Sequence, residues 1–290
     1  MTTYFLNKKI TTSIMNKGMI TKAFKIFLEA QKRSVGRPCK VGYWRILRAI
    51  LYKLRTGVQW KHLPMKQLFG KHSYSWSSAY YHFNKWSKSN AFVDLLRSVL
   101  SGHKREIDLS IANIDGTHTI SKKGGQAVGY QRRKKAKTSN SIIISDRNGQ
   151  PLFCSEPISG NHHDLFKIEK SVSKILNFIR SCDIPTKGLF LNADAGFDGA
   201  KLKRLCEREE ITLNVDRNKR NSSKAPDDDY FIDNKLYNNR FVIEQSNAWM
   251  DAFKGLMLRY ETSSQNWYSF QLLAFAAFFL RRIEKLTFSF

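Results

Sequence analysis

The sequence has 290 residues, of which 42% are hydrophobic, so the chain can bury a core and is long enough for about two domains. Its 49 Lys and Arg residues outnumber 24 Asp and Glu residues, which gives a formal net charge of +25. This charge excludes neither enzyme nor scaffold, but it favours a polyanionic partner: nucleic acid first, then an anionic membrane surface or a ribosome-like assembly.

Cysteine usage and hydropathy favour a cytoplasmic protein. The four cysteines are scattered and form no Cys-x-x-Cys pair, which argues against a disulfide frame or a zinc site. Residues 1–9 contain no signal-peptide core. The most apolar stretch, residues 267–280, contains Ser269 and Gln271 and is too short to span a bilayer. We therefore expect no membrane partner.

The first part of the chain is basic and helical. Residues 1–110 contain 21 Lys and Arg against four acids. After a break at residues 36–38, apolar residues at spacings of three and four predict an amphipathic helix that carries Arg45 and Arg48. Helices are also predicted for residues 73–86 and 91–100. The pattern fits a helix-turn-helix-like module and an ordinary helical bundle equally, and the charge favours the DNA-binding module.

After residue 106 the periodicity changes. Residues 107–114 predict a strand that ends at Asp115, and residues 141–154 predict a hairpin turned at Asn148-Gly149. Between them lies a basic loop, residues 121–137. Lys134 and Lys135 in this loop are expected to bind phosphate, and the alternative is that they are only surface charges beside a hairpin.

The remaining elements alternate between helix and strand. Strands are predicted at residues 189–193 and 211–215, and helices at residues 165–180 and 199–210. A polar loop at residues 217–239 precedes a long helix at residues 240–258 and a final apolar helix that ends near residue 285. We expect an all-α DNA-binding domain at residues 1–106 and an α/β catalytic domain at residues 107–290, with a mixed sheet flanked by helices.

Three acidic residues have settings that suggest a metal site. Asp115 and Asp194 each close an apolar run at the expected carboxyl end of a strand, where sites in open α/β sheets lie. Glu244 lies on the polar stripe of its helix with Arg240 and Asn247. Each acid taken alone has an ordinary structural explanation. Asp115 and Asp194 could be turn residues at strand ends, and Glu244 could form a surface ion pair with Arg240.

The combination of acids and basic surroundings points to phosphodiester chemistry. Magnesium prefers carboxylate oxygens, and two such ions about 3.5–4 Å apart can clamp the attacking and leaving oxygens at phosphorus. Asp198, near Asp194, is expected to be the N-cap of the helix that follows it. We do not assign a metal site to the triplet His162-His163-Asp164, because adjacent histidines in a loop are more often solvated or DNA-facing.

Four segments carry a family resemblance. Residues 54–64 read Leu-Arg-Thr-Gly-Val-Gln-Trp-Lys-His-Leu-Pro, residues 114–117 read Ile-Asp-Gly-Thr, residues 192–199 read Asn-Ala-Asp-Ala-Gly-Phe-Asp-Gly, and residues 240–260 begin Arg-Phe-Val-Ile-Glu. Together they resemble the DDE transposases of bacterial insertion sequences, in the clan of insertion sequences four and five and closest to the insertion sequence five group. The family signature Tyr-x2-Arg-x3-Glu-x6-Lys is matched by Tyr237, Arg240 and Glu244, but Asp251 stands at the lysine position.

The resemblance implies a ribonuclease-H-like catalytic domain in which Asp115, Asp194 and Glu244 hold two divalent cations, Mg²⁺ or Mn²⁺. It implies cleavage of double-stranded DNA at element ends, strand transfer into target DNA, and a homodimer in the active complex. The resemblance covers Arg259, and Lys254 lies one turn after the position of the missing lysine. With Tyr237 and Arg240, these two residues are the expected DNA contacts near the scissile phosphate.

Two alternatives stay open. A nuclease of the same fold would hydrolyse DNA without joining it to a target, and only a strand-transfer assay separates it from a transposase. A non-catalytic DNA-binding protein would be expected to lack one of the three acids, and all three are present.

Overall fold

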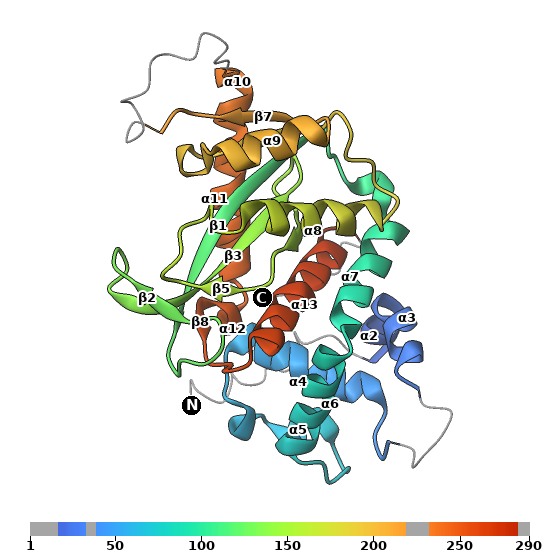
Figure 1. Ribbon diagram of the computed structural model, residues 1–290. Coiled ribbons are helices and arrows are strands. Elements are labelled where there is room, and N and C mark those ends of the chain that lie inside the picture. Colours follow the sequence, from blue (N-terminus) through green and yellow to red (C-terminus); the bar gives the residue numbers. More distant parts are fainter. Residues whose placement is uncertain (1–16, 33–38, 219–231, 284–290) are drawn as a thin grey trace, which may run out of the picture.

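The computed structural model describes residues 17–32, 39–218 and 232–283. The basic tail at residues 1–16, the break at residues 36–38 and most of the expected polar loop at residues 217–239 lie outside the described residues. Figure 1 shows a sheet with helices on both faces, joined to a cluster of shorter helices formed by the first part of the chain.

The first part of the chain is all helical where it is described, as expected. Its helices are α2 (Lys17–Ala23), α3 (Lys25–Ala30), α4 (Tyr43–Thr56), α5 (Met65–Phe69), α6 (Trp76–Lys88) and α7 (Ala91–Gly102), with short 3-10 turns η1 (Trp60–His62) and η2 (Lys104–Glu106). The apolar stripe of α4 is buried, including Leu47 and Leu54. The helix ends at Gly57, whose φ of 71° is a left-handed conformation that glycine adopts without strain.

The sheet follows the expected mixed topology. Its strands are β1 (Ile111–Ser121), β2 (Gly129–Gln131), β3 (Ala136–Ser145), β4 (Pro151–Cys154), β5 (Ile158–Ser159), β6 (Phe190–Ala193), β7 (Thr212–Val215) and β8 (Leu258–Arg259). β3 pairs antiparallel with β1 and β4, whereas β1, β6 and β7 run parallel. The order β4, β3, β1, β6, β7, with these directions, is that of a ribonuclease-H-like sheet and confirms the fold expectation.

Two strand predictions need correction. β1 does not end at Asp115 but continues to Ser121, because residues after Asp115 keep pairing with β3. The parallel pairing with β6 does stop at Asn113, so Asp115 still lies just beyond the parallel part of the sheet. The basic segment at residues 121–137 is not all loop, since β2 forms a hairpin with the start of β3.

Helices cover the two faces of the sheet. α8 (Ile168–Arg180) contacts β3 and β4, and α9 (Ala200–Arg208) contacts β7. α11 (Phe241–Asp251) contacts β1 from the other side, behind the sheet in Figure 1.

The prediction of one long helix at residues 240–258 is wrong, because the structure divides this range into separate elements. α10 (Asn234–Tyr237) and a 3-10 turn lead into α11, which ends at Asp251, and α12 (Lys254–Met257) is separate. Phe253, with ψ of 85°, leaves the helical conformation between them.

The last helix joins the two parts of the molecule. α13 (Ser264–Ile283) is buried from Asn266 to Leu280 and packs against α6, α7 and β4. Phe270 stacks on Phe83 of α6 with ring centroids 4.3 Å apart. No helix among the described residues, α13 included, is both long and apolar enough to cross a membrane.

Candidate active site

Asp115 lies on β1 with its side chain toward α11. Its Oδ1 accepts a hydrogen bond from the backbone N–H of Gly116 at 2.9 Å, and its Oδ2 accepts one from Nδ2 of Asn247 at 3.2 Å. Burial raises the pKa of Asp115, and the nearby charges of Asp194 and Asp164 raise it further, whereas both hydrogen bonds lower it. The site therefore holds a carboxylate whose charge lacks a cationic neighbour among these contacts.

Asp194 follows β6 immediately and begins the 3-10 turn Ala195–Phe197. Its Oδ1 accepts the backbone N–H of Gly196 at 2.9 Å, so the carboxylate caps the turn while remaining partly exposed. Its influence on the pKa of Asp115 places the two acids within electrostatic reach of each other. Asp194, just after β6, and Asp115, just beyond the part of β1 that pairs with β6, are thus placed on neighbouring strands.

Glu244 comes to the same region from α11. Its side chain is exposed, and it lies three residues before Asn247, so the two share one face of the helix. Asn247 contacts Asp115 directly, which shows that this face looks toward β1. Among the described residues no group of three His, Cys, Asp or Glu side chains lies close enough together to hold a metal ion, so the structure does not bring the three acids into one metal-binding cluster.

The position of α11 is fixed by the turn between β3 and β4. Ser246 donates a hydrogen bond to the carbonyl of Gly149. A Cβ atom on Gly149 would lie 2.8 Å from the Val242 carbonyl, and its φ of 75° also requires glycine. The Asn148-Gly149 turn predicted from the sequence thus serves as a docking point for the helix that carries Glu244.

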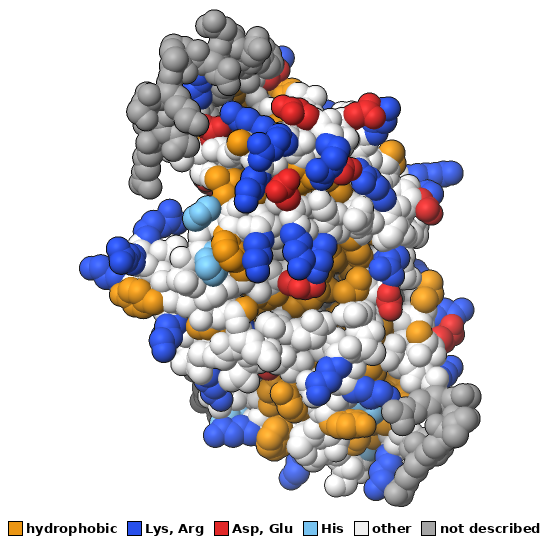
Figure 2. All heavy atoms as spheres, viewed as in Figure 1, with side chains coloured by type: hydrophobic (Ala, Val, Ile, Leu, Met, Phe, Trp, Pro, Cys, Tyr) orange, Lys and Arg blue, Asp and Glu red, His pale blue; other side chains and the backbone are white. Residues whose placement is uncertain are grey.

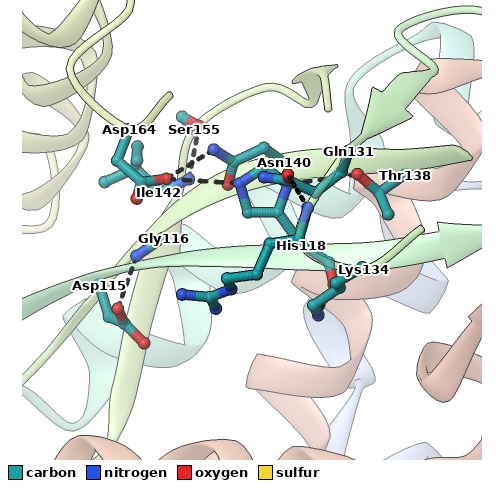
Figure 3. Close-up of polar contacts among 11 residues, drawn as sticks. Asp115, Gly116, His118, Gln131, Lys134, Thr138, Asn140, Ile142, Ser155 and Asp164 are labelled. Atoms are coloured by element: carbon teal, nitrogen blue, oxygen red, sulfur yellow. Dashed lines mark hydrogen bonds and ion pairs between the residues drawn. The ribbon is translucent and has the colours of Figure 1, made fainter. Parts of the chain in front are cut away.

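Asp164 is a fourth acid that sequence reasoning set aside. A Cβ atom on Gly116 would lie 2.1 Å from Asp164 Oδ1, so only glycine allows this approach to β1. Asn140 donates to the same oxygen at 2.6 Å, and His118 Nε2 lies 3.8 Å from it (Figure 3). The only sequence signal was Gly116 itself, next to Asp115, and its meaning depends on a loop far along the chain.

His118 and Lys134 form the other side of this cluster. His118 Nδ1 lies 3.2 Å from the Thr138 hydroxyl, and Lys134 Nζ donates to the backbone carbonyl of His118 at 2.5 Å (Figure 3). Burial lowers the pKa of His118, and the charge of Asp164 opposes that shift. A pocket beside β1 is lined by His118, Lys134, Asn247 and Asp251, while Lys135 is exposed on the hairpin.

Tyr237 and Arg240 form a unit just before α11. Arg240 donates to the Tyr237 hydroxyl at 3.0 Å, and its guanidinium lies 5.1 Å from the centre of the same ring. Arg240 Nε is buried and has no hydrogen-bond acceptor among the described residues. Because Glu244 follows Arg240 by one helical turn, the unit lies close to Glu244.

Arg45 and Arg48 lie on α4, away from the three acids. The Arg45 guanidinium lies 4.6 Å from the centre of the Trp44 ring, and Arg48 Nε is buried without an acceptor among the described residues. Burial and the charge of Arg45 lower the pKa of Arg48.

Arg259 and Lys254 are placed differently from the expectation. Arg259 is 0% exposed and donates to the carbonyls of Gln126 and Glu261 and to the Ser139 hydroxyl. A phosphate cannot reach a guanidinium enclosed in this way, so we correct the expected DNA contact to a structural role. Lys254 is exposed on α12 at the junction with α4, where its carbonyl approaches Gly57, and not on the face of α11 that carries Glu244.

Asp198 does not cap α9 as expected. The N-cap of α9 is Gly199, and Asp198 instead pairs with Lys203 at 2.9 Å and accepts the backbone N–H of Asn218 at 3.1 Å. These contacts lower the pKa of Asp198, although burial opposes them. Its carboxylate is therefore engaged in structural contacts, unlike that of Asp194.

Two protein-family models match the sequence of this chain. Residues 106–279, more than half of the chain, match the family described as "Transposase DDE domain". This chain belongs to the DDE transposase family. Residues 22–96 match a second model, "Putative transposase of IS4/5 family", so the transposase is of the type of insertion sequences four and five. Membership implies an enzyme of DNA transposition that depends on a divalent cation.

Solved transposase structures share a distant likeness with this transposase. A synaptic complex of the piggyBac transposase with hairpin DNA is 9% identical with a TM-score of 0.46, and covers 95% of this chain and 75% of its own. The Mos1 strand transfer complex is 9% identical with a TM-score of 0.28, and covers 90% of this chain and 84% of its own. At this level the likeness carries no argument about function. A search of curated proteins finds no match.

The acids of the transposase fit a divalent cation. Asp115 and Asp194 are carboxylates within electrostatic reach of each other, with no cationic partner in the contacts described above, and Asp115 is held in place by two donors. Two close carboxylates repel each other unless a cation lies between them. Oxygen ligands from Asp and Glu are those that Mg²⁺ and Mn²⁺ prefer.

Proposed function

We propose that Asp115, Asp194 and Glu244 are the catalytic triad and hold two Mg²⁺ or Mn²⁺ ions. The observation that carries this proposal is that Asn247, on the helix face of Glu244, contacts Asp115, whose pKa in turn responds to Asp194. In this proposal acids from β1, β6 and α11 act together at one edge of the sheet. When bound, the cations supply the charge that favours in-line attack at phosphorus, first by water and then by the DNA 3′-hydroxyl.

The protein's own residues would position the DNA. Tyr237 and Arg240 precede the helix of Glu244, and the Arg240 guanidinium would contact a phosphate through its other nitrogens, since its Nε is buried. Lys134 lies beside the pocket next to β1, with Lys135 further out on the hairpin and Lys254 on α12. These cations would hold the backbone without reading its sequence.

The first part of the chain would recognise the element ends. Residues 1–110 contain 21 of the 49 basic residues and four of the 24 acids. In Figure 2 basic side chains spread over the whole visible face, while acidic ones are seen mainly over α8 and α9. We assign end binding to residues 1–106, with Arg45 and Arg48 among the contacts, and catalysis to residues 107–290.

The wider assignment completes the proposal. The protein would be a bacterial, cytoplasmic and DNA-associated transposase of the insertion sequence five group, whose partners are double-stranded element ends and target DNA. A homodimer is proposed as the active complex, because two ends must be joined to one target.

Cleavage by triad variants tests the proposal. Full-length protein is incubated with Mg²⁺ or Mn²⁺ and DNA that flanks its own gene, and both cut and joined products are measured. Single changes of Asp115, Asp194 or Glu244 to Ala are expected to abolish both products, while DNA affinity is retained, because removal of a carboxylate reduces repulsion with phosphate. Metal-dependent cleavage by any one variant would remove that residue from the triad. Cleavage by the wild type without joining would indicate a nuclease.

A further inference from the structure

Three buried asparagines form a row across the parallel strands behind the acids. Asn113 on β1, Asn192 on β6 and Asn214 on β7 are paired in register, and they are 0%, 0% and 2% exposed. Each is followed two residues later by an aspartate: Asp115, Asp194 and Asp216. Because side chains alternate along a strand, Asn113 points to the same side of the sheet as Asp115, whereas Asp194 and Asp216 directly follow the ends of β6 and β7.

The three side chains are hydrogen-bonded in series. Asn192 Nδ2 donates to Asn113 Oδ1 at 3.2 Å, and Asn214 Nδ2 donates to Asn192 Oδ1 at 2.9 Å. The direction is fixed at one end, because Asn214 Oδ1 must accept the backbone N–H of Asp233 at 3.0 Å. With that oxygen fixed, both N–H groups of Asn214 and of Asn192 meet an oxygen, and Asn113 Oδ1 accepts from Asn192, so the orientation of each amide is set.

Asn192 and Asn214 each use their second amide hydrogen to bind the backbone of the segment that leads to α11. Asn192 Nδ2 donates to the carbonyl of Leu236 at 2.9 Å, and Asn214 Nδ2 donates to the carbonyl of Asp233 at 3.1 Å. Leu236 lies in α10, and Asp233 is its N-cap. The row therefore holds α10 from both its start and its last turn.

The other end of the row reaches the second support of α11. Asn113 Nδ2 donates to the carbonyl of Asp146 at 3.3 Å. Asp146 opens the turn whose Gly149 carbonyl accepts the Ser246 hydroxyl of α11. A single chain of side-chain amides thus links two of the places where the α10–α11 unit is attached to the sheet, α10 itself and the β3–β4 turn.

Burial of three amides is costly unless every polar atom is paired, and apolar side chains would fill a sheet face as well. We therefore explain the row by the backbone groups that it binds, which would otherwise lack a hydrogen-bond partner. We propose that Asn113, Asn192 and Asn214 are positioning residues that set α10–α11 against the sheet edge, and so hold Glu244 opposite Asp115 and Asp194. The inference rests on the proposed triad and adds the residues that assemble it.

Two variants of the full-length protein test this, Asn192→Ala and Asn214→Ala. Both remove bonds to α10 and leave the acids unchanged. Hydrogen exchange of amides in residues 234–244 is expected to accelerate roughly tenfold or more, the factor for one lost buried hydrogen bond. The Mn²⁺ concentration for half-maximal cleavage of DNA flanking the gene is expected to rise, because Glu244 is less well placed, while DNA affinity stays within about twofold, as no phosphate contact is lost.

Asn266→Ala is the matched control. Asn266 is 1% exposed and contacts Tyr80 in the packing between α13 and α6, far in the chain from α10. It should lower the melting temperature without altering the Mn²⁺ dependence or the exchange of residues 234–244. If the Asn192 and Asn214 variants behave like Asn266→Ala in both measurements, the row is only structural and the inference fails. If the wild type does not cleave, the proposed function fails, whereas hydrogen exchange still tests the attachment of α10.

Discussion

At the residue scale, Asp194 and Asp198 lie close in the sequence but make different contacts. Asp194 accepts only a backbone N–H of its own turn in the contacts described, whereas Asp198 is paired with Lys203. The sequence offers both acids within one motif, and spacing alone cannot rank them. Geometry ranks them, because a carboxylate already paired with a lysine is a poor ligand for a cation.

We predict that Asp194→Asn is folded but inactive, whereas Asp198→Asn keeps appreciable cleavage. The amide oxygen introduced by Asp194→Asn can still accept the Gly196 N–H, but a neutral amide is a poor replacement for a charged metal ligand. Asp198→Asn loses the pair with Lys203, worth about 0–1 kcal/mol at this exposure. Metal-dependent cleavage rates and melting temperatures decide it. An active Asp194→Asn beside a stable but dead Asp198→Asn would reverse the assignment.

His118 should contribute to the pH dependence of stability. Burial lowers the pKa of His118 below 6.5, so at low pH the unfolded chain takes up the proton first. The stability contributed by neutral His118 is therefore present above about pH 6.5 and lost as the pH falls through the folded-state pKa. Urea unfolding at several pH values, with metal chelated, should show a smaller loss on acidification for His118→Gln than for the wild type. Parallel profiles would contradict this.

At the element scale, α12 and the end of α4 form a close backbone contact. A Cβ atom on Gly255 would lie 2.6 Å from the Leu54 carbonyl, and one on Gly57 would lie 3.1 Å from the Lys254 carbonyl. Nearby, Lys53 pairs with Glu261 at 3.4 Å, and both side chains are about nine-tenths buried. These contacts tie the proposed DNA-binding helices to the segment that follows Glu244.

We predict that Gly255→Ala destabilises the protein by about 1–3 kcal/mol, because backbone atoms cannot move aside as a flexible side chain can. Gly102→Ala is the control, since a Cβ atom there meets nothing within 4 Å. That change should be neutral or stabilise by up to about 1 kcal/mol. Denaturant unfolding of both variants measures the difference, and equal stabilities would show that the α4–α12 contact is looser than described.

At the scale of the whole molecule, the two proposed functional parts do not pack independently. α13 comes last in the chain but packs on α6 and α7, so a fragment of residues 1–106 would expose the surface that α13 covers. DNA binding by the first part of the chain is therefore best measured in the full-length protein. The net charge of +25 is a property of the whole surface, and individual contacts must be separated by substitution.

DNA affinity should fall steeply with salt. If the protein neutralises about six phosphates, affinity falls roughly thousandfold between about 50 and 200 mM salt, because counterions are released on binding. Arg45→Gln should reduce the slope of log affinity against log salt by about one. Lys174→Gln is the matched control, since Lys174 pairs with Glu156 on the α8 side. An unchanged slope for Arg45→Gln would remove α4 from the proposed interface.

The helices α4, α6 and α7, the strands β1, β3, β4, β6 and β7, and the β3–β4 turn could be predicted because each depends on local periodicity or on a turn dipeptide, whereas the short elements α2, α3, α5, β2, β5 and β8 were not predicted. The ends of elements were less predictable. β1 extends past Asp115 because β3 supplies partners, and the helix at residues 240–258 is interrupted because Phe253 leaves the helical conformation at the α12 junction. Asp164 could not be found from the sequence, since its approach to Gly116 joins a loop to a strand.

The sequence by itself determined the family, the fold class and the candidate acids, because these depend on residue order and on the alternation of side chains along strands and helices. Only the tertiary structure decided which side chains meet. It enclosed Arg259 among carbonyls, engaged Asp198 with Lys203, and aligned Asn113, Asn192 and Asn214 into one hydrogen-bonded row. The physical reason is that hydrogen bonds and burial depend on distances between segments far apart in the chain, and no local pattern records those distances.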